Sequence, residues 1–273
     1  MKITKKRILT DTQNTKIVEI SVYAPHIAKK AKPGQFVVVM ASEQGERIPL
    51  TFVDAKNDEI TLIFQEAGLS TKLLGKLNEG DSLYAVLGPL GHETEIKNFG
   101  KVILVAGGVG IAEIYSVVKG LRQAGNHVDT IIGARSKDFL FLEKELREVS
   151  NKLHITTDDG SCERKGFTTD VLKELLSNDT YNIVHAVGPI PMMKKVAEVT
   201  KDFNIKTLVS LNSLMLDATG MCGGCRVTVG GEVKFACVDG PEFDGQLVDW
   251  DELEKRNKTY EQKEQHICRL YKS

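Results

Sequence analysis

Apolar segments alternate with helical segments through the middle of the chain. Strand-like runs lie at residues 102–106, 128–134, 154–157, 182–187 and 206–210. The amphipathic stretches between them predict helices that end near residue 123 and that span 141–149, 168–176 and 191–201. Such alternation is typical of a parallel sheet with helices on both faces. We therefore expect an α/β domain over residues 99–210.

The first part of the chain, residues 1–98, has a different pattern. Short β-rich runs, among them 17–22, 36–40 and 59–64, are separated by turn residues such as Pro33 and Gly34. Several short strands at this spacing indicate an antiparallel β-barrel.

Two further regions follow residue 210. Residues 211–248 contain a cysteine cluster and a hairpin pattern with Gly230–Gly231 at its turn. Residues 249–273 are rich in Glu, Lys and Gln, which predicts a charged, solvated C-terminal helix. The expected domain order is thus barrel, α/β domain, cysteine segment and charged tail.

Composition excludes several classes of protein. The chain has 273 residues, of which 41% are hydrophobic, and a net charge of −1. We therefore expect roughly two domains and no nucleic-acid or membrane partner. The longest apolar stretch, near 102–112, is broken by three glycines and is far shorter than the roughly 20 residues of a membrane span. Because the N-terminus also lacks a secretory pattern, a cytoplasmic protein is expected.

The cysteines predict a metal centre. Four residues separate Asp217 from Cys222, two separate Cys222 from Cys225, and eleven separate Cys225 from Cys237. The first three positions match the Cys-x4-Cys-x2-Cys pattern of plant-type [2Fe–2S] sites, with aspartate in the first place. The intervening glycines suit a tight loop whose N–H groups face cluster sulfides. We expect these four residues to be the ligands.

Two alternatives apply to the cysteines. Cys-x2-Cys also begins many zinc sites, although zinc sites more often show a second close pair of ligands. Unligated thiols are the other reading of the cluster, and a plain turn residue is the other reading of Asp217. Cys162 and Cys268 fall outside the spacing, so we expect both to be free structural thiols.

Glycine-containing turns follow several of the predicted strands. Gly107, Gly108 and Gly110 lie between an apolar strand and a helix, where a dinucleotide pyrophosphate can approach the backbone and the helix N-terminus. The strict Gly-x-Gly-x-x-Gly pattern is absent, and such turns also serve simply to pack a strand on a helix. Other turns at the same sheet edge contain Arg135, Asp158, Gly188, Pro189 and Met192. We expect all of these residues to line a nucleotide site.

Two of these residues have a second interpretation. Arg135 is expected either to contact a nucleotide or to be a solvated surface arginine. Asp158 and Asp159 are expected to be turn and cap residues rather than catalysts. The sequence Arg135–Ser136–Lys137 would also suit a 2′-phosphate, so the residues alone leave the choice between NAD and NADP open.

Residues of the predicted barrel suggest a flavin site. Arg47 can neutralise a pyrophosphate, and the extended backbone of Pro49, Leu50 and Thr51 can hydrogen-bond a flavin edge. Gly68, Ser70 and Thr71 lie at a predicted helix start that suits a second phosphate contact. Each motif is a common loop pattern on its own, and the prediction depends on their order in the chain.

The complete order of motifs resembles a known family. Arg-x-Pro-x-Thr, Gly-x-x-Thr, Gly-Gly-Val-Gly, Gly-Pro-x-Pro-Met-Met and the cysteine cluster follow one another as in the ferredoxin-reductase-like electron-transfer subunits. That family includes the electron-transfer subunit of class 1B dihydroorotate dehydrogenase. It also includes the small subunit of NADH-dependent reduced ferredoxin:NADP oxidoreductase, also called the sulfide dehydrogenase small subunit. The resemblance covers residues 1 to about 248.

The resemblance implies FAD on the barrel, NAD(H) on the α/β domain and one [2Fe–2S] cluster. Its dihydroorotate branch holds the cluster with four cysteines, whereas Asp217 at the first position resembles the transhydrogenase branch. For that branch it implies a larger flavin and iron–sulfur subunit, where NADP(H) and ferredoxin react and electrons bifurcate. No side chain is then needed as a catalytic acid or base.

Three functions remain open at this stage. The first is an NAD(H)-linked electron-transfer subunit of a ferredoxin:NADP transhydrogenase. The second is the dihydroorotate dehydrogenase electron-transfer subunit. The third belongs to a different class, a zinc-stabilised nucleotide-binding regulator without redox turnover.

Overall fold

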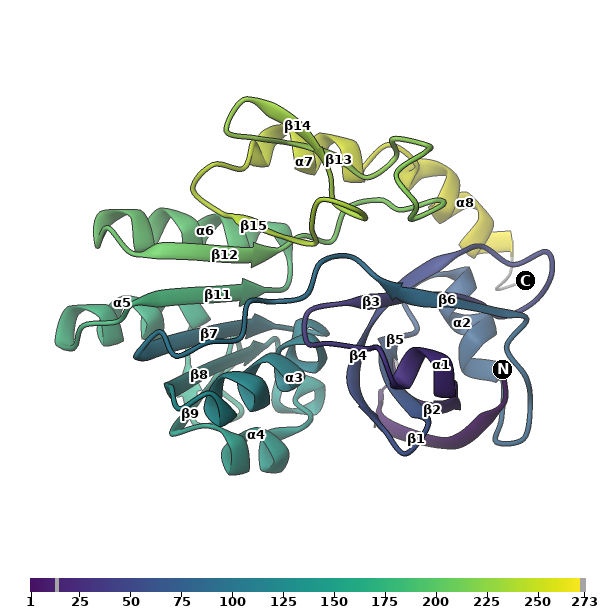
Figure 1. The fold of residues 1–273 in the computed structure, drawn as a ribbon, viewed down its shortest axis with the longest axis horizontal. Coiled ribbons are helices and arrows are strands. Elements are labelled where there is room, and N and C mark those ends of the chain that lie inside the picture. The colour runs from purple at the N-terminus through teal and green to yellow at the C-terminus, as the bar shows by residue number, and fades with distance from the viewer. Residues whose placement is uncertain (13–14, 271–273) are drawn as a thin grey trace.

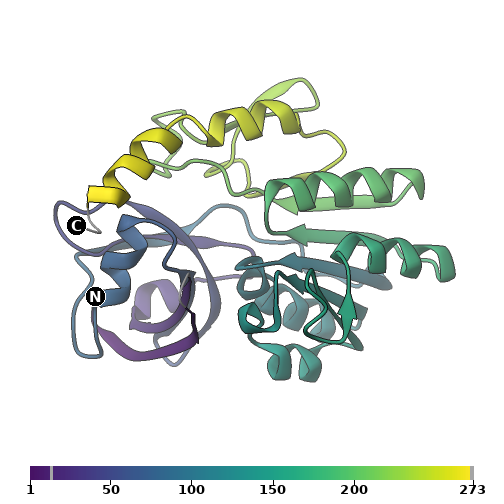
Figure 2. The ribbon, with the colours of Figure 1, turned by 180° about the vertical axis from the view of Figure 1, so that it is seen from behind.

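Two sheets lie next to each other in the protein, and a third, smaller segment lies across both (Figure 1). A computed structural model describes residues 1–12 and 15–270. The N-terminal sheet curls around its own core, and the larger second sheet carries helices on its faces. Figure 2 shows the same arrangement from behind, with the C-terminal helices passing back towards the N-terminal sheet.

The N-terminal sheet is antiparallel, with six strands in the order β1-β2-β5-β4-β3-β6. Its apolar residues, such as Val18, Ile20 and Phe64, are buried in a core inside the curl. A backbone hydrogen bond of 2.8 Å from Ile3 N to Asp81 O ties the first strand to the segment before the last. The strands are β1 (Ile3–Asp11), β2 (Lys16–Tyr23), β3 (Phe36–Met40), β4 (Ile48–Lys56), β5 (Glu59–Gln65) and β6 (Ala85–Leu90), with helices α1 (Pro25–Ala28) and α2 (Leu69–Lys76).

The second sheet has seven strands in the order β10-β9-β8-β7-β11-β12-β15. It is parallel except for β15, which pairs antiparallel with β12. Its strands are β7 (Lys101–Gly107), β8 (His127–Ala134), β9 (Lys152–Thr157), β10 (Arg164–Lys165), β11 (Ile183–Val187), β12 (Lys206–Ser210) and β15 (Glu242–Asp244). The five strands expected from apolar runs are present. The short β10 and β15 were not predicted, because neither is an apolar run.

Helices cover both faces of this sheet. The helices α3 (Gly110–Gln123) and α4 (Glu143–Val149) pack on one face, and a 3-10 turn spans Lys137–Phe139. The helices α5 (Thr168–Asn178) and α6 (Ile190–Asp202) pack on the other face. The helix α3 also contacts β4 of the first sheet, so it joins the two sheets.

The third segment contains the predicted hairpin. Strands β13 (Arg226–Val229) and β14 (Glu232–Phe235) are antiparallel. Gly230 and Gly231 at the turn have φ of 60° and 82°, the conformation that favours glycine in two-residue hairpin loops. The hairpin therefore forms as the diglycine pattern predicts.

The C-terminal tail differs from the single solvated helix that was expected. It forms two helices, α7 (Trp250–Asn257) and α8 (Glu261–Leu270). Leu253 of α7 is fully buried, and the Trp250 indole N–H donates to the Gly245 carbonyl at 3.0 Å. These two apolar residues fix α7 on the hairpin. The overall composition of the tail, which is mostly charged, does not predict this contact.

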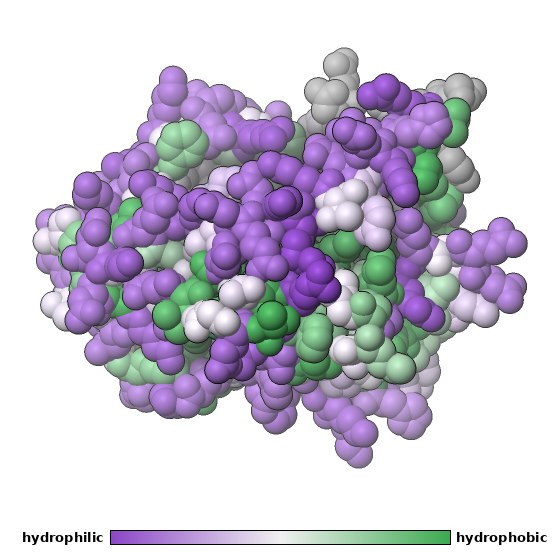
Figure 3. Space-filling model, turned by 90° about the horizontal axis from the view of Figure 1, so that it is seen from above, coloured by the Kyte–Doolittle hydropathy of each residue, from purple (hydrophilic) through white to green (hydrophobic). Residues whose placement is uncertain are grey.

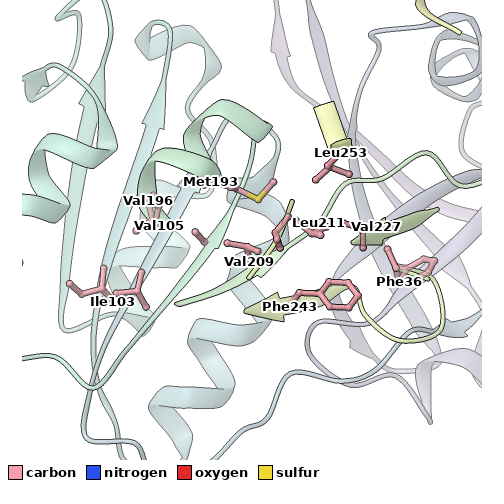
Figure 4. Packing of buried hydrophobic residues seen from close by; sticks show 14 of the residues in the cluster. Phe36, Ile103, Val105, Met193, Val196, Val209, Leu211, Val227, Phe243 and Leu253 are labelled. Carbon is pink, nitrogen blue, oxygen red and sulfur yellow. The ribbon is translucent and has the colours of Figure 1, made fainter. Parts of the chain in front are cut away.

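One hydrophobic core connects the three parts of the molecule (Figure 4). It runs from Ile103 and Val209 of the second sheet, through Phe243 of β15, to Val227 of the hairpin and Phe36 of the first sheet. The proposed domain limits at residues 98, 210 and 248 stay a prediction. Within the described residues, no helix combines the length and the apolar character that crossing a bilayer requires.

Candidate functional site

A cleft of about 1130 Å³ opens at the carboxyl ends of the parallel strands. Residues from both sheets and from α7 line it, including Thr15 and Gln65 of the first sheet and Asn257 of α7. Ligands of such sheets bind at this edge. The residues predicted from the second sheet to contact a nucleotide all line this cleft: Gly107, Gly108, Gly110, Arg135, Asp158, Gly188, Pro189 and Met192.

The glycine loop is closely packed against the residues around it. A Cβ atom at Gly110 would lie 2.5 Å from the Val187 carbonyl oxygen, and one at Gly107 would lie 2.6 Å from Met192 Sδ. By contrast, a Cβ at Gly108 would meet nothing within 4 Å, and this residue has a φ of 56°. The loop therefore packs tightly on β11 and α6 while Gly108 faces open space, which fits the approach of a dinucleotide to the backbone.

The neighbouring turns agree with the predictions made for them. Arg135 is exposed at the end of β8. The Asp158 N–H donates to the Ala134 carbonyl. The Asp159 carboxylate accepts the Ser161 hydroxyl at 2.6 Å and the Ser161 N–H at 2.9 Å, and these bonds lower the pKa of Asp159. Asp159 is thus a turn residue. The nucleotide contacts proposed for Arg135 and Asp158 stay predictions.

The predicted flavin residues come together on the first sheet. Ser70, in the first turn of α2, hydrogen-bonds the carboxylate of Glu46, which precedes Arg47. Thr71 closes the same turn, because its hydroxyl accepts the Gly68 N–H at 3.1 Å. Arg47 is exposed and has no hydrogen-bond or ion-pair partner among the described residues. A cationic side chain beside a helix N-terminus suits a pyrophosphate.

The strand β4 carries the other three flavin candidates from α2 towards the cleft. Pro49 and Leu50 pair with Val38 and Val37 of β3. Thr51, next along the strand, donates from its hydroxyl to the Glu113 carboxylate of α3 at 3.2 Å. The flavin candidates on β4 therefore lead directly to the α/β domain.

Glu113 is a site residue that the sequence did not single out. It lines the cleft, and burial raises the pKa of its carboxyl to about 7 despite the opposing hydrogen bond from Thr51. A glutamate in the first turn of a helix is usual there, because it complements the helix dipole. Nothing in the sequence separates this partly buried carboxyl from an ordinary one.

The hairpin brings two of the predicted metal ligands together. Cys225 and Cys237 are both buried, and their sulfurs lie 3.2 Å apart. Burial, together with the neighbouring Cys225, raises the pKa of the Cys237 thiol to about 12. Two buried thiols so close cannot both ionise unless a cation neutralises them. The pair therefore fits a metal centre.

The other two candidates lie on the exposed part of the loop. The Asp217 carboxylate accepts the N–H groups of Thr219 and Cys222, each at 2.9 Å, and these bonds lower its pKa. The Cys222 sulfur accepts the Gly224 N–H at 3.3 Å. Residues 1–12 and 15–270 contain no group of three or more such side chains already placed around a metal position. The ligand role of Asp217 and Cys222 stays a prediction.

Apolar side chains surround this loop. Met221 is 88% exposed, and Leu216, Val233, Val238 and Leu247 of the same segment are also exposed. Figure 3 views the molecule from the side of this segment, and hydrophobic residues gather in the middle of a largely hydrophilic face. The cysteine pair therefore lies below a surface that is unusually apolar for such a charged chain.

Two family models match the chain. The iron-sulfur cluster binding domain of dihydroorotate dehydrogenase B matches residues 212–249. The oxidoreductase NAD-binding domain matches residues 104–198. The first contains the cysteine pair and the second contains the glycine loop, so the iron–sulfur and nucleotide regions predicted from the sequence are confirmed.

Known proteins resemble the whole chain. A Thermotoga maritima protein named dihydroorotate dehydrogenase B (NAD(+)), electron transfer subunit homolog, is 47% identical over 250 residues, which cover 91% of this chain and 88% of that protein. A solved structure of NADH-dependent reduced ferredoxin-NADP oxidoreductase, from work on flavin-based electron bifurcation, has a TM-score of 0.93 at 44% identity. The match covers 99% of this chain and 96% of that one.

More distant structures show the fold alone. A ferredoxin-NADP+ reductase from Plasmodium falciparum is 15% identical, with a TM-score of 0.59 over 74% of this chain and 89% of its own. The predicted ferredoxin-reductase-like fold, which implies FAD, is confirmed. The chain belongs to the family of the dihydroorotate dehydrogenase B electron transfer subunits.

Proposed function

We propose that this chain is the NAD(H)-linked electron-transfer subunit of an oxidoreductase complex. It takes reducing equivalents from NADH through FAD to a [2Fe–2S] cluster and passes them to a larger partner subunit. The observation that carries the proposal is structural continuity. The buried cysteine pair shares a core with Ile190 and Met192 of the nucleotide cleft, and Thr51, a flavin candidate on β4, hydrogen-bonds Glu113 of the same cleft.

The chain's own residues position the cofactors. Gly108 leaves room for a dinucleotide backbone, and Arg47 with the start of α2 holds a pyrophosphate. FAD bound there would supply the chemistry that divides the two electrons of a hydride into single electrons. Thr51 orients the flavin edge beside the cleft. Cys225 and Cys237, with Cys222 and Asp217, hold the iron.

The partner is proposed to be a larger flavin and iron–sulfur subunit at which NADP(H) and ferredoxin react. The solved structure of the ferredoxin-NADP oxidoreductase supports this choice by its high similarity over nearly the full chain. Asp217, in place of the first cysteine of the cluster motif, also favours it. The apolar surface around Met221 is a suitable place for the partner to dock.

A second candidate is the electron-transfer subunit of dihydroorotate dehydrogenase. The name of the Thermotoga maritima relative favours it. The two candidates share the NADH, flavin and cluster steps and differ only in the partner. The choice between them is therefore a question about the complex.

The deciding experiment uses the complex purified anaerobically with its co-purifying subunit. We expect a yellow-brown protein with flavin and two irons per cluster in this chain, whose flavin is bleached by NADH. The complex should then reduce NADP+ with reduced ferredoxin. Dihydroorotate-dependent reduction of NAD+ instead would identify the second candidate, and a colourless zinc protein would contradict both.

A further inference from the structure

A small cavity, partly open to solvent, adjoins the nucleotide cleft and shares Glu113 and Val187 with it. Its volume is about 20 Å³, which is enough for one water molecule, since a water needs roughly 10–15 Å³ by this measure. Its walls come from β4, α3, β11, β12 and β15, where the two sheets meet. The polar side chains that line it are Thr51, Glu113, His185, Ser210 and Glu242.

His185 is the most unusual of these residues. Its side chain is 5% exposed, and neither ring nitrogen has a hydrogen-bond partner in the structure. A buried imidazole without partners is costly, because burial removes the hydrogen bonds that water would make. The nearest charged group is Glu242, whose Oε1 lies 3.5 Å from His185 Nδ1.

Glu242 connects this histidine with the outside. Its side chain is 18% exposed, and its Oε1 accepts the Thr94 hydroxyl at 2.9 Å. At the other end, Glu113 lines both the small cavity and the nucleotide cleft. Glu113, His185 and Glu242 are the titratable side chains that line the cavity, among the residues that the structure describes.

The proposed function requires that a proton leave the flavin site. A hydride carries two electrons and one proton, whereas an iron–sulfur cluster accepts electrons only. Each hydride delivered by NADH therefore leaves one proton at the flavin once both electrons have moved on. That proton has to leave the flavin site before the next cycle.

We propose that Glu113, the cavity, His185 and Glu242 form a proton exit path from the flavin site to solvent. Glu113 accepts the proton, so that an O–H bond forms as a flavin N–H bond breaks. A cavity water relays it to one nitrogen of His185. The other nitrogen, Nδ1, gives its own proton to Glu242, which releases it to water. The inference rests on the proposed function, since it assigns a fate to that proton.

The raised pKa of Glu113, about 7, agrees with this role, because a relay group works best when its pKa is close to the ambient pH. Thr51 fits as a positioning residue. Its hydroxyl holds the Glu113 carboxylate at 3.2 Å, on the strand expected to contact the flavin.

The test measures proton release separately from electron transfer. The anaerobic holo complex is reduced with dithionite, which bypasses NADH, and is then mixed with ferricyanide in weak buffer with a pH indicator. In the wild type, proton release should follow flavin oxidation. In His185→Gln and Glu242→Gln, we expect it to lag by about 100-fold, the low end of what a positioned proton-transfer group contributes.

A second readout locates the proton. Infrared difference spectra taken during oxidation should show a protonated carboxyl band that is absent in Glu113→Gln and persists longer in His185→Gln. Glu242→Gln, at a partly exposed position, keeps the test valid if the buried histidine variant does not fold. The matched control is His154→Gln, because His154 is in the same sheet, has an unpartnered Nε2 and lies outside both cavities.

Three outcomes are decisive. A lag in both variants, with His154→Gln like the wild type, supports the path. Proton release at the wild-type rate in both variants overturns it and means that the proton leaves through the open cleft. Failure of NADH to bleach the wild-type flavin would instead count against the proposed function, because dithionite reduction tests the path without NADH.

Discussion

The nucleotide cleft and the cysteine loop are stabilised in opposite ways. The glycine loop is packed against β11 and α6, with no room for a Cβ at Gly107 or Gly110. The predicted ligands of the cysteine loop differ in burial. Cys225 and Cys237 are buried and in contact, whereas Asp217 is only partly buried, Cys222 is exposed, and both are bonded to nearby backbone N–H groups.

This difference separates two kinds of binding site. Close packing of the glycine loop shapes one wall of the cleft, and residues of the first sheet and α7 complete it. The cysteine loop carries the predicted metal ligands, and metal binding supplies free energy that orders such sites. Changes at the two sites should therefore have independent effects.

The largest expected effect is at the buried cysteine pair. Cys225→Ser removes a buried sulfur from the proposed ligand set, so we expect complete loss of the cluster's electron paramagnetic resonance signal in the reduced complex. Flavin reduction by NADH should persist, because the cleft does not depend on the metal. Cys162→Ser is the control, since this thiol lies on the second sheet far from the hairpin in sequence. Loss of both signals in Cys225→Ser would show that the sites are not independent.

The next effect should come from the cleft. Gly110→Val places a side chain where even a Cβ would lie 2.5 Å from the Val187 carbonyl oxygen. Overpacking of this kind costs about 1–3 kcal/mol, and we expect NADH binding to weaken roughly 10- to 100-fold as the loop shifts. The measurement is titration calorimetry with NADH, together with iron content, which should not change.

Gly120→Ala is the matched control in the same helix. Its Cβ would lie 3.1 Å from the end of the Ile96 side chain, which can move. Wild-type NADH affinity in Gly110→Val would contradict the view that packing shapes the cleft.

The same contrast explains what the sequence could predict about the sites. Spacing identified the cysteines, and glycines after apolar strands identified the loop, because both features are local. Glu113 and His185 could not be found in this way. Their role depends on contacts with Thr51 and Glu242, which are distant in sequence and meet only in the folded protein.

A third, smaller effect concerns Glu113 and pH. Burial raises its pKa from 4.5 to about 7, so the folded state binds more protons than the unfolded state between these values. The stability of the wild type should therefore fall, on this account, as pH rises through that window. The free energy of unfolding of Glu113→Gln, relative to that of the wild type, should rise by about 2 kcal/mol between pH 5 and pH 8, after allowance for solvent screening.

Urea unfolding of both proteins at each pH measures this difference. Glu93→Gln is the control. The hydrogen bond from Lys32 lowers the pKa of Glu93, so removing this carboxylate should lower the stability of the protein at neutral pH. If the free energies of unfolding of Glu113→Gln and the wild type differed by the same amount at every pH, the pKa of Glu113 would be the same in the folded and unfolded states.

The central strands of the second sheet can be predicted from the sequence, whereas its edge strand and α7 cannot. Apolar runs located the central strands of the second sheet, since those strands are buried on both faces. The strand β15 was not predictable, because only Phe243 among its three residues is buried. For the same reason the charged composition of the tail predicts a solvated helix at α7, although Leu253 fixes it to the core.

The smallest effect should be at Asp217, and it tests the cysteine loop before metal binds. In the metal-free chain the Asp217 carboxylate accepts the N–H groups of Thr219 and Cys222, and these bonds lower its pKa. A lowered pKa means that the stabilisation is present at neutral pH and is lost as pH falls below the ordinary value for aspartate. Asp217→Ala should therefore speed amide hydrogen exchange at these two residues in the metal-free chain. Exchange at Gly108 and in β7 should stay slow, because backbone packing protects the cleft. Equal protection of the loop in Asp217→Ala would mean that it is held by more than this one carboxylate, and the contrast between the two sites would then be smaller than the structure indicates.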